Sequence, residues 1–254
     1  MKSPQEHPLL ILDWGIGGIG TLLKVGSVRP DLDIVYISDA GQVPYGKQTH
    51  AQLSDRVQDL VEHAAHHHGV THAIIACNAA STIMPVSTFS IPVLGVIEKG
   101  LEVLEEVEAE HIGVIGGERT ILSGAWTDPL EAMGFRVSSK IAQALSALIE
   151  AGQHLDSSSR PVFSKILSGF KDVDLLILAC THYVAASVLI SELLPGVHLY
   201  DPVDACVDYA LKEWPLSGGR ASIRFLSSGD IDEMIQGAKL AYDYDIPFEK
   251  CTRI

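Results

Sequence analysis

Basic residues, long apolar runs and cysteine are all scarce in this 254-residue sequence, and each shortage excludes a class of function. Lys and Arg number 18 against 32 Asp and Glu, which gives a net charge of -14 at pH 7. We therefore expect no nucleic-acid partner and no anionic membrane surface, since both require a clustered basic face. No apolar run approaches the roughly 20 residues of a membrane helix. Residues 1–7 are polar and lack the apolar core of a signal peptide.

The four cysteines are too few and too widely spaced for the disulfide framework of a small secreted protein. They are Cys77, Cys180, Cys206 and Cys251. We expect free thiols in a reducing cytoplasm, with Cys206 and Cys251 as structural residues. Hydrophobic residues make up 47% of the chain, so it can bury a substantial core, either as one large domain or as two small ones.

Two short apolar segments, residues 73–78 and 176–181, both end in Ala, Cys and a small polar residue. Each segment predicts a buried strand. Its cysteine, Cys77 or Cys180, then follows at the carboxyl end, where open α/β sheets bind ligands. The two cysteines are 103 positions apart. They indicate two related halves that each present one thiol to a shared cleft.

The same offset of 103 positions relates Pro92 to Pro195, and the apolar residues 10–12 to residues 113–115. Strand and helix patterns alternate along the chain, which predicts α/β domains with mostly parallel sheets. We expect two pseudo-symmetric domains that face a central cleft. The first would comprise residues 1–98 and 206–254, and the second residues 99–205.

Individual elements follow from apolar periodicity and turn residues. Strands are predicted at 9–12, 34–37, 73–77, 92–97, 111–115, 135–138, 175–179, 197–201 and 224–227, the last of these being the final strand. Helices are predicted from 21, and at 50–68, 101–108, 120–133 with an interruption at Pro129, 142–151, 162–170, 184–194, 205–213 and 231–242.

A glycine-rich segment at 15–20 satisfies G-x-G-x-x-G between a predicted strand and a predicted helix. Asp39, 19 residues later, lies near the position of a ribose-binding carboxylate. The alternative function is therefore an NAD-dependent oxidoreductase. Asp13 argues against it, because a carboxylate at that strand end would face the pyrophosphate with the wrong charge. We favour glycines that bring backbone N–H groups close to a smaller ligand.

Four histidines, at 63, 66, 67 and 68, raise the possibility of a metal site, since His63 and His67 are one helical turn apart. The segment lacks the H-E-x-x-H pattern of zinc enzymes. No C-x-x-C pair is present either. We interpret the histidines as a solvated helix end and expect no metal.

A single cysteine at a strand end is usually a small buried hydrophobic residue. Here two repeat-related cysteines are each followed by a carboxylate-binding residue, Asn78 or Thr181. His182 lies two positions after Cys180 and could exchange its proton and favour the thiolate. Asp13 would serve Cys77 in the same way if the first two strand ends are neighbours. From sequence alone, Glu150 is an ordinary helix-end carboxylate.

Eight short motifs, in this order along the chain, resemble those of the aspartate/glutamate racemase family. They are L-D-x-G-x-G-G at 12–18, Y-x-x-D at 36–39, V-P-Y-G at 43–46, A-C-N at 76–78, T-I-x-S-G at 120–124, I-E-x-G at 149–152, A-C-T-H-Y at 179–183 and S-G-D at 228–230. The resemblance covers nearly the whole chain. It implies racemisation at the α-carbon without pyridoxal phosphate, metal or other cofactor.

In the mechanism that the resemblance implies, one thiolate removes the α-proton and the opposing thiol protonates the other face. Two acids of similar strength serve both enantiomers, and a thiol with an ordinary pKa of about 8.5 needs help to ionise. The implied catalytic residues are Cys77, Cys180, Asp13, Glu150 and His182. The implied substrate-binding residues are Asn78 and Thr181 for the α-carboxylate, Pro44, Tyr45 and Gly46 for the side-chain carboxylate, and Trp14, Ala79 and Thr120 in the pocket.

Two positions depart from the family pattern: Trp14 stands where the family usually has Ser, and Ala79 where it has Thr. Trp14 adds bulk and Ala79 removes a hydroxyl donor, and such changes can shift specificity. If Trp14 points inward, aspartate is favoured over glutamate; if it points outward, glutamate returns to favour.

We expect a homodimer that acts on an acidic amino acid. Besides the oxidoreductase, a non-catalytic amino-acid-binding module stays open. Within the same superfamily an inactive protein, or a malonate decarboxylase that needs one thiol, also stays open, although the pair of cysteines with His182 argues against both.

Overall fold

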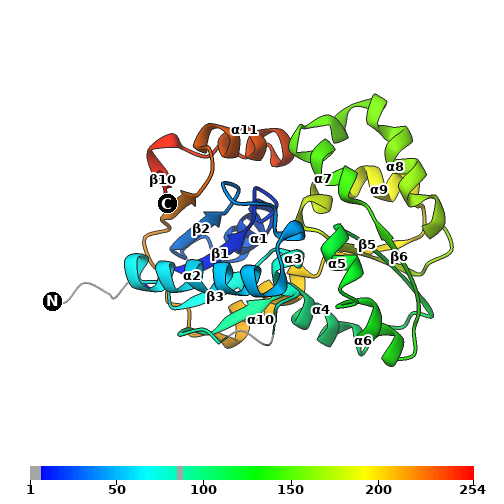
Figure 1. The fold of residues 1–254 in the computed structure, drawn as a ribbon, viewed down its shortest axis with the longest axis horizontal. Coiled ribbons are helices and arrows are strands. Elements are labelled where there is room, and N and C mark those ends of the chain that lie inside the picture. The colour runs from blue at the N-terminus through cyan, green and yellow to red at the C-terminus, as the bar shows by residue number, and fades with distance from the viewer. Residues whose placement is uncertain (1–6, 85–87) are drawn as a thin grey trace.

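The computed structural model describes residues 7–84 and 88–254, and the polar segment 1–6 lies outside them. Two parallel sheets form two lobes that lie side by side (Figure 1). The first sheet has the order β10-β9-β2-β1-β3-β4, and the second β6-β5-β7-β8. The strands of the first sheet are β1 (Leu9–Asp13), β2 (Ile34–Ser38), β3 (His72–Ile75), β4 (Val93–Gly95), β9 (Ile223–Ser227) and β10 (Cys251–Arg253). Those of the second are β5 (His111–Gly116), β6 (Arg136–Ile141), β7 (Leu175–Ala179) and β8 (His198–Tyr200).

The strand pairing shows the internal repeat residue by residue. Leu9 of β1 pairs with Ile34 of β2 and with His72 of β3. The residues 103 positions later pair in the same way in β5, β6 and β7. The order β2-β1-β3-β4 therefore recurs as β6-β5-β7-β8, and the two pseudo-symmetric α/β units with parallel sheets are confirmed.

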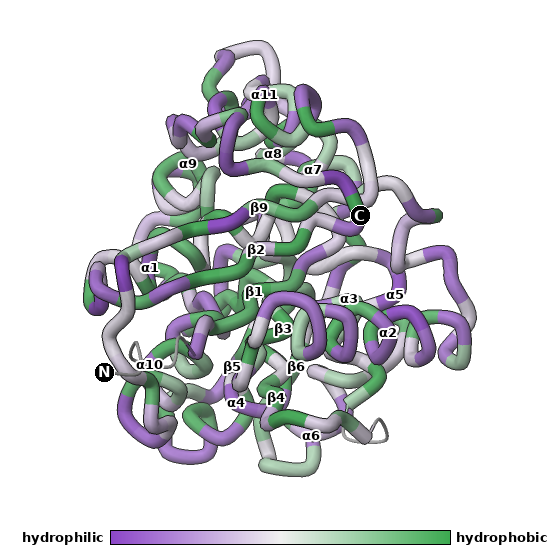
Figure 2. The backbone as a smooth tube through the Cα atoms, turned by 90° about the vertical axis from the view of Figure 1, so that its left-hand side faces the viewer, coloured by the Kyte–Doolittle hydropathy of each residue, from purple (hydrophilic) through white to green (hydrophobic). Residues whose placement is uncertain are grey.

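The helices cover both faces of each sheet, which explains why the central strands are apolar throughout. All five residues of β1, β2 and β7 are buried, and the first sheet forms the apolar centre of its lobe in Figure 2. The helices are α1 (Ile19–Val28), α2 (His50–His68), α3 (Asn78–Ser81), α4 (Val96–Leu104), α5 (Glu118–Leu122), α6 (Thr127–Ala132), α7 (Gln143–Glu150), α8 (Arg160–Leu167), α9 (Ser187–Leu193), α10 (Val203–Glu213) and α11 (Ile231–Tyr242).

Alternate residues of β1 contribute to separate cores on the two faces of the first sheet. Leu9 and Ile11 pack in the core that includes apolar residues of α1, α10 and α11. Leu10 and Leu12 pack in the core that includes the apolar side of α2. Helix α11 also reaches α7 of the other lobe (Figure 1). The C-terminal helix therefore bridges the two lobes.

Helix α2 shows how local sequence sets an element's bounds. Thr49 and Gln52 form a capping box at its start, which satisfies two exposed backbone donors. Gly69 ends it in the left-handed conformation, with a φ of 69°. The predicted bounds, 50–68, are confirmed. No helix within residues 7–84 and 88–254 combines the length and apolarity needed to cross a bilayer.

Several element predictions had the wrong bounds, and the helix predicted at 101–108 runs from Val96 to Leu104. The strand predicted at 92–97 ends at Gly95, and Val96 already begins α4. The helix predicted at 120–133 breaks around Gly124, whose φ of 70° favours glycine. Pro129 instead lies inside the first turn of α6, where a missing N–H costs little. The strand at 223–227 is followed by a further edge strand, β10.

The expected domain boundaries at 98/99 and 205/206 fall inside α4 and α10, and these two helices pack against each other. All strands of the first sheet lie within 1–98 and 206–254, and all strands of the second within 99–205. The division into domains at those residues stays a prediction, because shared helices cross both boundaries.

Candidate active site

A cavity of about 390 Å³ lies at the carboxyl ends of the strands, with residues of both lobes in its walls. The structure brings all thirteen of the predicted site residues to its lining. They are Asp13, Trp14, Pro44, Tyr45, Gly46, Cys77, Asn78, Ala79, Thr120, Glu150, Cys180, Thr181 and His182. Cys77 directly precedes α3, and Cys180 directly follows β7. The two thiols therefore come from repeat-related places in the two sheets.

Asp13 is buried at the end of β1, next to the strand that leads to Cys77. Burial raises the pKa of the Cys77 thiol well above its usual value, and the negative charge of Asp13 raises it further. In this geometry Asp13 favours the protonated thiol, so it does not by itself supply the help toward thiolate that the resemblance implies. It can instead accept the proton when Cys77 gives one up.

Cys180 belongs to a chain of three polar side chains. Its Sγ lies 3.7 Å from Nδ1 of His182, and Nε2 of His182 lies 2.8 Å from Oε1 of Glu150. Burial disfavours the imidazolium, but hydrogen bonds to Cys180 and Glu150, together with their negative charges, raise the pKa of His182 well above its usual value. A protonated His182 can therefore stabilise a thiolate on Cys180.

Glu150 is the last residue of α7. A carboxylate at a helix C-terminus is unfavourable for the helix dipole, and the contact with His182 offsets that cost. Residue patterns left Glu150 an ordinary helix-end carboxylate, because its partner His182 is 32 positions away, and only the family resemblance implied a catalytic role for it. Ser146, one turn earlier on α7, lies 3.5 Å from Sγ of Cys180 and was not predicted.

The glycine-rich segment packs the two lobes together. The Oγ1 of Thr181 donates a hydrogen bond of 2.9 Å to Oδ2 of Asp13. A Cβ added to Gly17 would overlap that hydroxyl and lie 2.8 Å from Nδ1 of His182. Tyr242 of α11 donates to the carbonyl oxygens of Gly17 and Thr181 at 3.0 and 3.1 Å. These glycines are thus not the cradle for a small ligand that we expected, and Gly17 does not line the cavity.

The dinucleotide interpretation fails at Asp39. Its carboxylate is fully buried and accepts hydrogen bonds from Arg56, from the Tyr45 hydroxyl at 2.9 Å and from the Ser228 hydroxyl at 2.7 Å. These partners leave it no accessible oxygen for a ribose. They also fix Tyr45 by its hydroxyl, and Pro44, Tyr45 and Gly46 all line the cavity.

Asn78 carries a donor that no described residue satisfies. Its Oδ1 accepts a 3.1 Å hydrogen bond from Nε1 of Trp126, while its Nδ2 is buried without a partner. Because buried polar groups are nearly always paired, we infer that a ligand in the cavity supplies the acceptor for this Nδ2. Trp126, which orients the amide, was missed because only packing brings it to Asn78.

Trp14 is among the residues that line the cavity. Its Nε1 donates to the carbonyl oxygen of Gln42 at 3.2 Å. Trp14 also lines a second cavity of about 360 Å³, which residues of α11 border. Ala79 lines the first cavity with no polar side-chain atom of its own.

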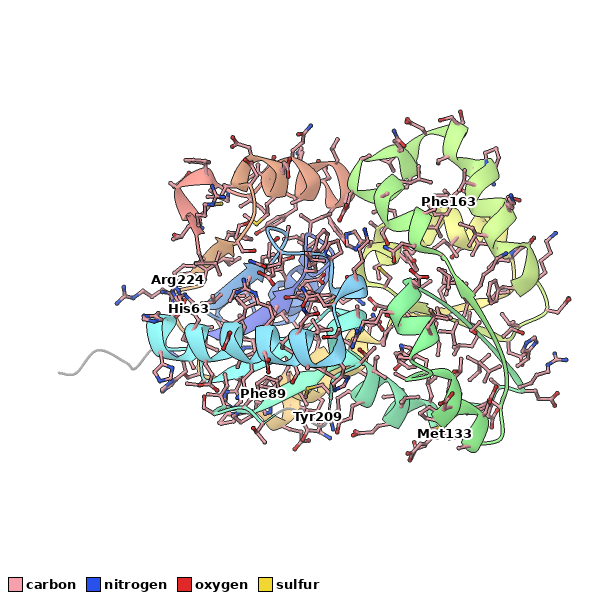
Figure 3. The ribbon with its side chains drawn as sticks, viewed as in Figure 1. His63, Phe89, Met133, Phe163, Tyr209 and Arg224 are labelled. Carbon is pink, nitrogen blue, oxygen red and sulfur yellow. The ribbon has the colours of Figure 1, made fainter. Side chains whose placement is uncertain are left out.

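The histidine cluster lies at the end of α2 and takes no part in the cavity. The rings of His63 and His67 are 4.6 Å apart, and Arg224 donates to the carbonyl oxygen of His68 at 3.1 Å. Figure 3 shows His63 and Arg224 together at this edge of the lobe. Within the described residues, no group of three or more His, Cys, Asp or Glu side chains could hold a metal ion.

Known proteins resemble this chain over most of its length. Residues 22–210 match the model of the Asp/Glu/Hydantoin racemase family. A glutamate racemase from Aquifex aeolicus is 34% identical over 221 residues, which cover 84% of this chain and 85% of that protein. A glutamate racemase from Picosynechococcus is 30% identical over 94% of this chain and 90% of its own length.

Among solved structures, the glutamate racemase of Thermus thermophilus in complex with beta-chloro-D-alanine superposes with a TM-score of 0.86. Its sequence is 26% identical, and the match covers 99% of this chain and 98% of that one. The similarity therefore extends over both lobes and the cavity between them.

Proposed function

This chain belongs to the Asp/Glu/Hydantoin racemase family, and we propose that it interconverts the enantiomers of an acidic amino acid with Cys77 and Cys180 as the two proton-transfer groups. The observation that carries the proposal is the pair of thiols, at repeat-related positions in two sheets, in one cavity. Enzymes of this family are isomerases that need no pyridoxal phosphate.

The two thiols start in complementary protonation states. In this mechanism Cys180 acts first as the base, and the imidazolium of His182 beside it balances the negative charge of the thiolate. Cys77 stays protonated, because burial and the Asp13 carboxylate oppose its ionisation. Cys180 removes the α-proton of one enantiomer, the electron pair delocalises into the α-carboxylate, and Cys77 protonates the opposite face. The reverse reaction starts from the exchanged protonation states. In those states Cys77 is the thiolate and Cys180 carries the proton taken from the substrate, so the reverse reaction needs no further proton.

Substrate carboxylates have two places in the cavity. The unpartnered Nδ2 of Asn78 and the Thr181 backbone bind the α-carboxylate, whose negative charge increases as the α-proton leaves. We assign the side chain of the substrate to the wall that includes Pro44 to Gly46, which line the cavity. Trp14 lines the same cavity and is bulkier than the serine usual in the family, so we expect less room for a long side chain and a preference for aspartate. Glutamate is the second candidate, and it is favoured by the relatives that are named glutamate racemases.

The experiment is α-proton exchange in deuterium oxide, under reducing conditions, with each enantiomer of aspartate and of glutamate. NMR would follow the α-proton while polarimetry follows racemisation. We expect exchange with loss of rotation, faster for aspartate. Faster exchange with glutamate would contradict the role given to Trp14. No exchange with any of the four would contradict the racemase itself.

Two substitutions separate the racemase from the alternatives. Cys77→Ser and Cys180→Ser should each abolish racemisation, because a serine hydroxyl is a far weaker acid than a thiol. A binding module would have no activity to lose in either variant. An oxidoreductase would be stabilised against heat by NAD, for which we expect no effect. Assembly as a homodimer and a cytoplasmic location remain predictions, which sedimentation and cell fractionation would test.

A further inference from the structure

Arg119 at the start of α5 crosses from the second lobe to the first. Its Nε donates to Oγ1 of Thr82 at 2.8 Å, and its Nη1 donates to the carbonyl oxygen of Gln48 at 2.8 Å. Arg119 also lines the cavity that holds the two thiols. The guanidinium therefore lies at the seam between the lobes, within the candidate site.

No carboxylate of the described residues forms an ion pair with Arg119, although acidic residues outnumber basic ones by 32 to 18. By contrast, the partly buried Arg56 and Lys24 each bond to an aspartate. Burial lowers the pKa of Arg119, and the nearby Cys77 opposes that shift. A guanidinium stays protonated in proteins. A partly desolvated cation without a counter-ion is costly, so its position in the cavity points to an anionic ligand.

The position of Arg119 indicates which anion it would meet. A Cβ built on Gly46 would lie 4.0 Å from Cβ of Arg119, so Arg119 lies next to the segment from Pro44 to Gly46. The unpartnered amide of Asn78 serves the α-carboxylate instead. The cavity thus offers separate donors for two carboxylates, and a planar guanidinium suits a carboxylate geometrically.

We propose that Arg119 binds the side-chain carboxylate of the substrate and so selects dicarboxylic amino acids over their amides. This inference rests on the proposed function, since it names the substrate group that the same cavity recognises. The competing explanation is mechanical: Arg119 would only hold the lobes together through Thr82 and Gln48. The two explanations predict different changes in the ratio of the affinity for the acid to the affinity for the amide. If Arg119 only joined the lobes, its loss would weaken the binding of acids and amides equally.

The test compares dissociation constants for DL-aspartate and DL-asparagine, and for DL-glutamate and DL-glutamine, from thermal-shift titrations. Racemic ligands keep their composition whether or not the protein turns them over. In Arg119→Gln the preference for acid over amide should fall about tenfold or more, as expected for loss of a charge-assisted hydrogen bond. The affinity for the amides should stay nearly unchanged.

Two further variants keep the test decisive. Thr82→Val removes one contact between the lobes but keeps the cation, and should retain the preference. Lys212→Gln removes an exposed positive charge on α10, outside the cavity lining, and should also retain it. The proposal is overturned if Arg119→Gln weakens acids and amides equally, or if either other variant lowers the ratio as far as Arg119→Gln does.

Failure of the proposed function would look different. A protein that binds acids more tightly than amides through Arg119 but exchanges no α-proton would retain this inference and lose the racemase. A protein that racemises aspartate or glutamate with an unchanged ratio in Arg119→Gln would retain the racemase and lose this inference.

Discussion

Replacing Gly17 with alanine should disable the site through a single methyl group. The added Cβ would overlap the hydroxyl of Thr181 and lie 2.7 Å from Oδ2 of Asp13 and 2.8 Å from Nδ1 of His182. Gly17 is not among the glycines with positive φ, so the substitution introduces no backbone strain. The lobes must move apart or the side chains must rotate. Overpacking of this kind costs about 1 to 3 kcal/mol of the free energy of unfolding.

The catalytic loss should exceed the loss of stability. Movement of His182 lengthens its 3.7 Å contact with Cys180, and a misplacement of about 1 Å can reduce a rate about 100-fold. Urea denaturation would measure the free energy of unfolding, and α-proton exchange would measure the rate. The matched control is Gly26→Ala in α1, where the added methyl group meets no atom within 4 Å. It should increase stability by about 0.5 to 1 kcal/mol, because alanine favours a helix, and leave the rate unchanged.

A Gly17→Ala protein with a rate within about threefold of wild type, which is about 0.65 kcal/mol in activation free energy, would refute the close-packing explanation. Gly17 would then have to serve some other purpose, such as the approach of a ligand to the backbone.

Three further predictions concern buried polar groups. Trp126→Phe leaves the Oδ1 of Asn78 without its donor and should cost about 1 to 3 kcal/mol of stability, by urea denaturation, and raise KM for the amino acid. Glu150→Gln should lower the pKa of His182, visible in an NMR titration, because a partner that raises it is lost. A folded-state imidazole pKa above the unfolded value stabilises the fold fully below about pH 6.5. This stabilisation is lost as the pH rises through the folded-state pKa. The unfolding free energies of wild type and Glu150→Gln should therefore differ more at about pH 6 than at high pH. Asp39→Asn removes the charge that neutralises the partly buried guanidinium of Arg56 and should lower the free energy of unfolding by about 3 to 5 kcal/mol. An unchanged midpoint in urea denaturation would contradict a stabilising role for this ion pair.

Short-range sequence patterns predicted most of the fold because each strand and helix is determined by nearby residues. The apolar runs before Cys77 and Cys180 are buried strands, and α2 begins and ends at its predicted residues. The errors came where the pattern was ambiguous. Val96 is apolar in either a strand or a helix, and the three-residue strand β10 carries too few residues to show alternation.

The internal repeat and the eight family motifs predicted which residues would line one cavity, although neither describes the shape of that cavity. Parallel strands related by an offset of 103 positions must present their carboxyl ends in equivalent places, and the cysteines follow those ends. The sequence by itself therefore determined two parallel sheets, two thiols and the side chains around them.

Only the tertiary structure decided how those side chains act on one another. The hydrogen bond from Thr181 to Asp13 joins residues 168 positions apart, and that from Trp126 to Asn78 joins residues 48 positions apart. The structure also gave Gly17 a packing role and placed Arg119 in the cavity without a counter-ion. No periodic pattern encodes such contacts, because they depend on how two separately specified lobes pack together.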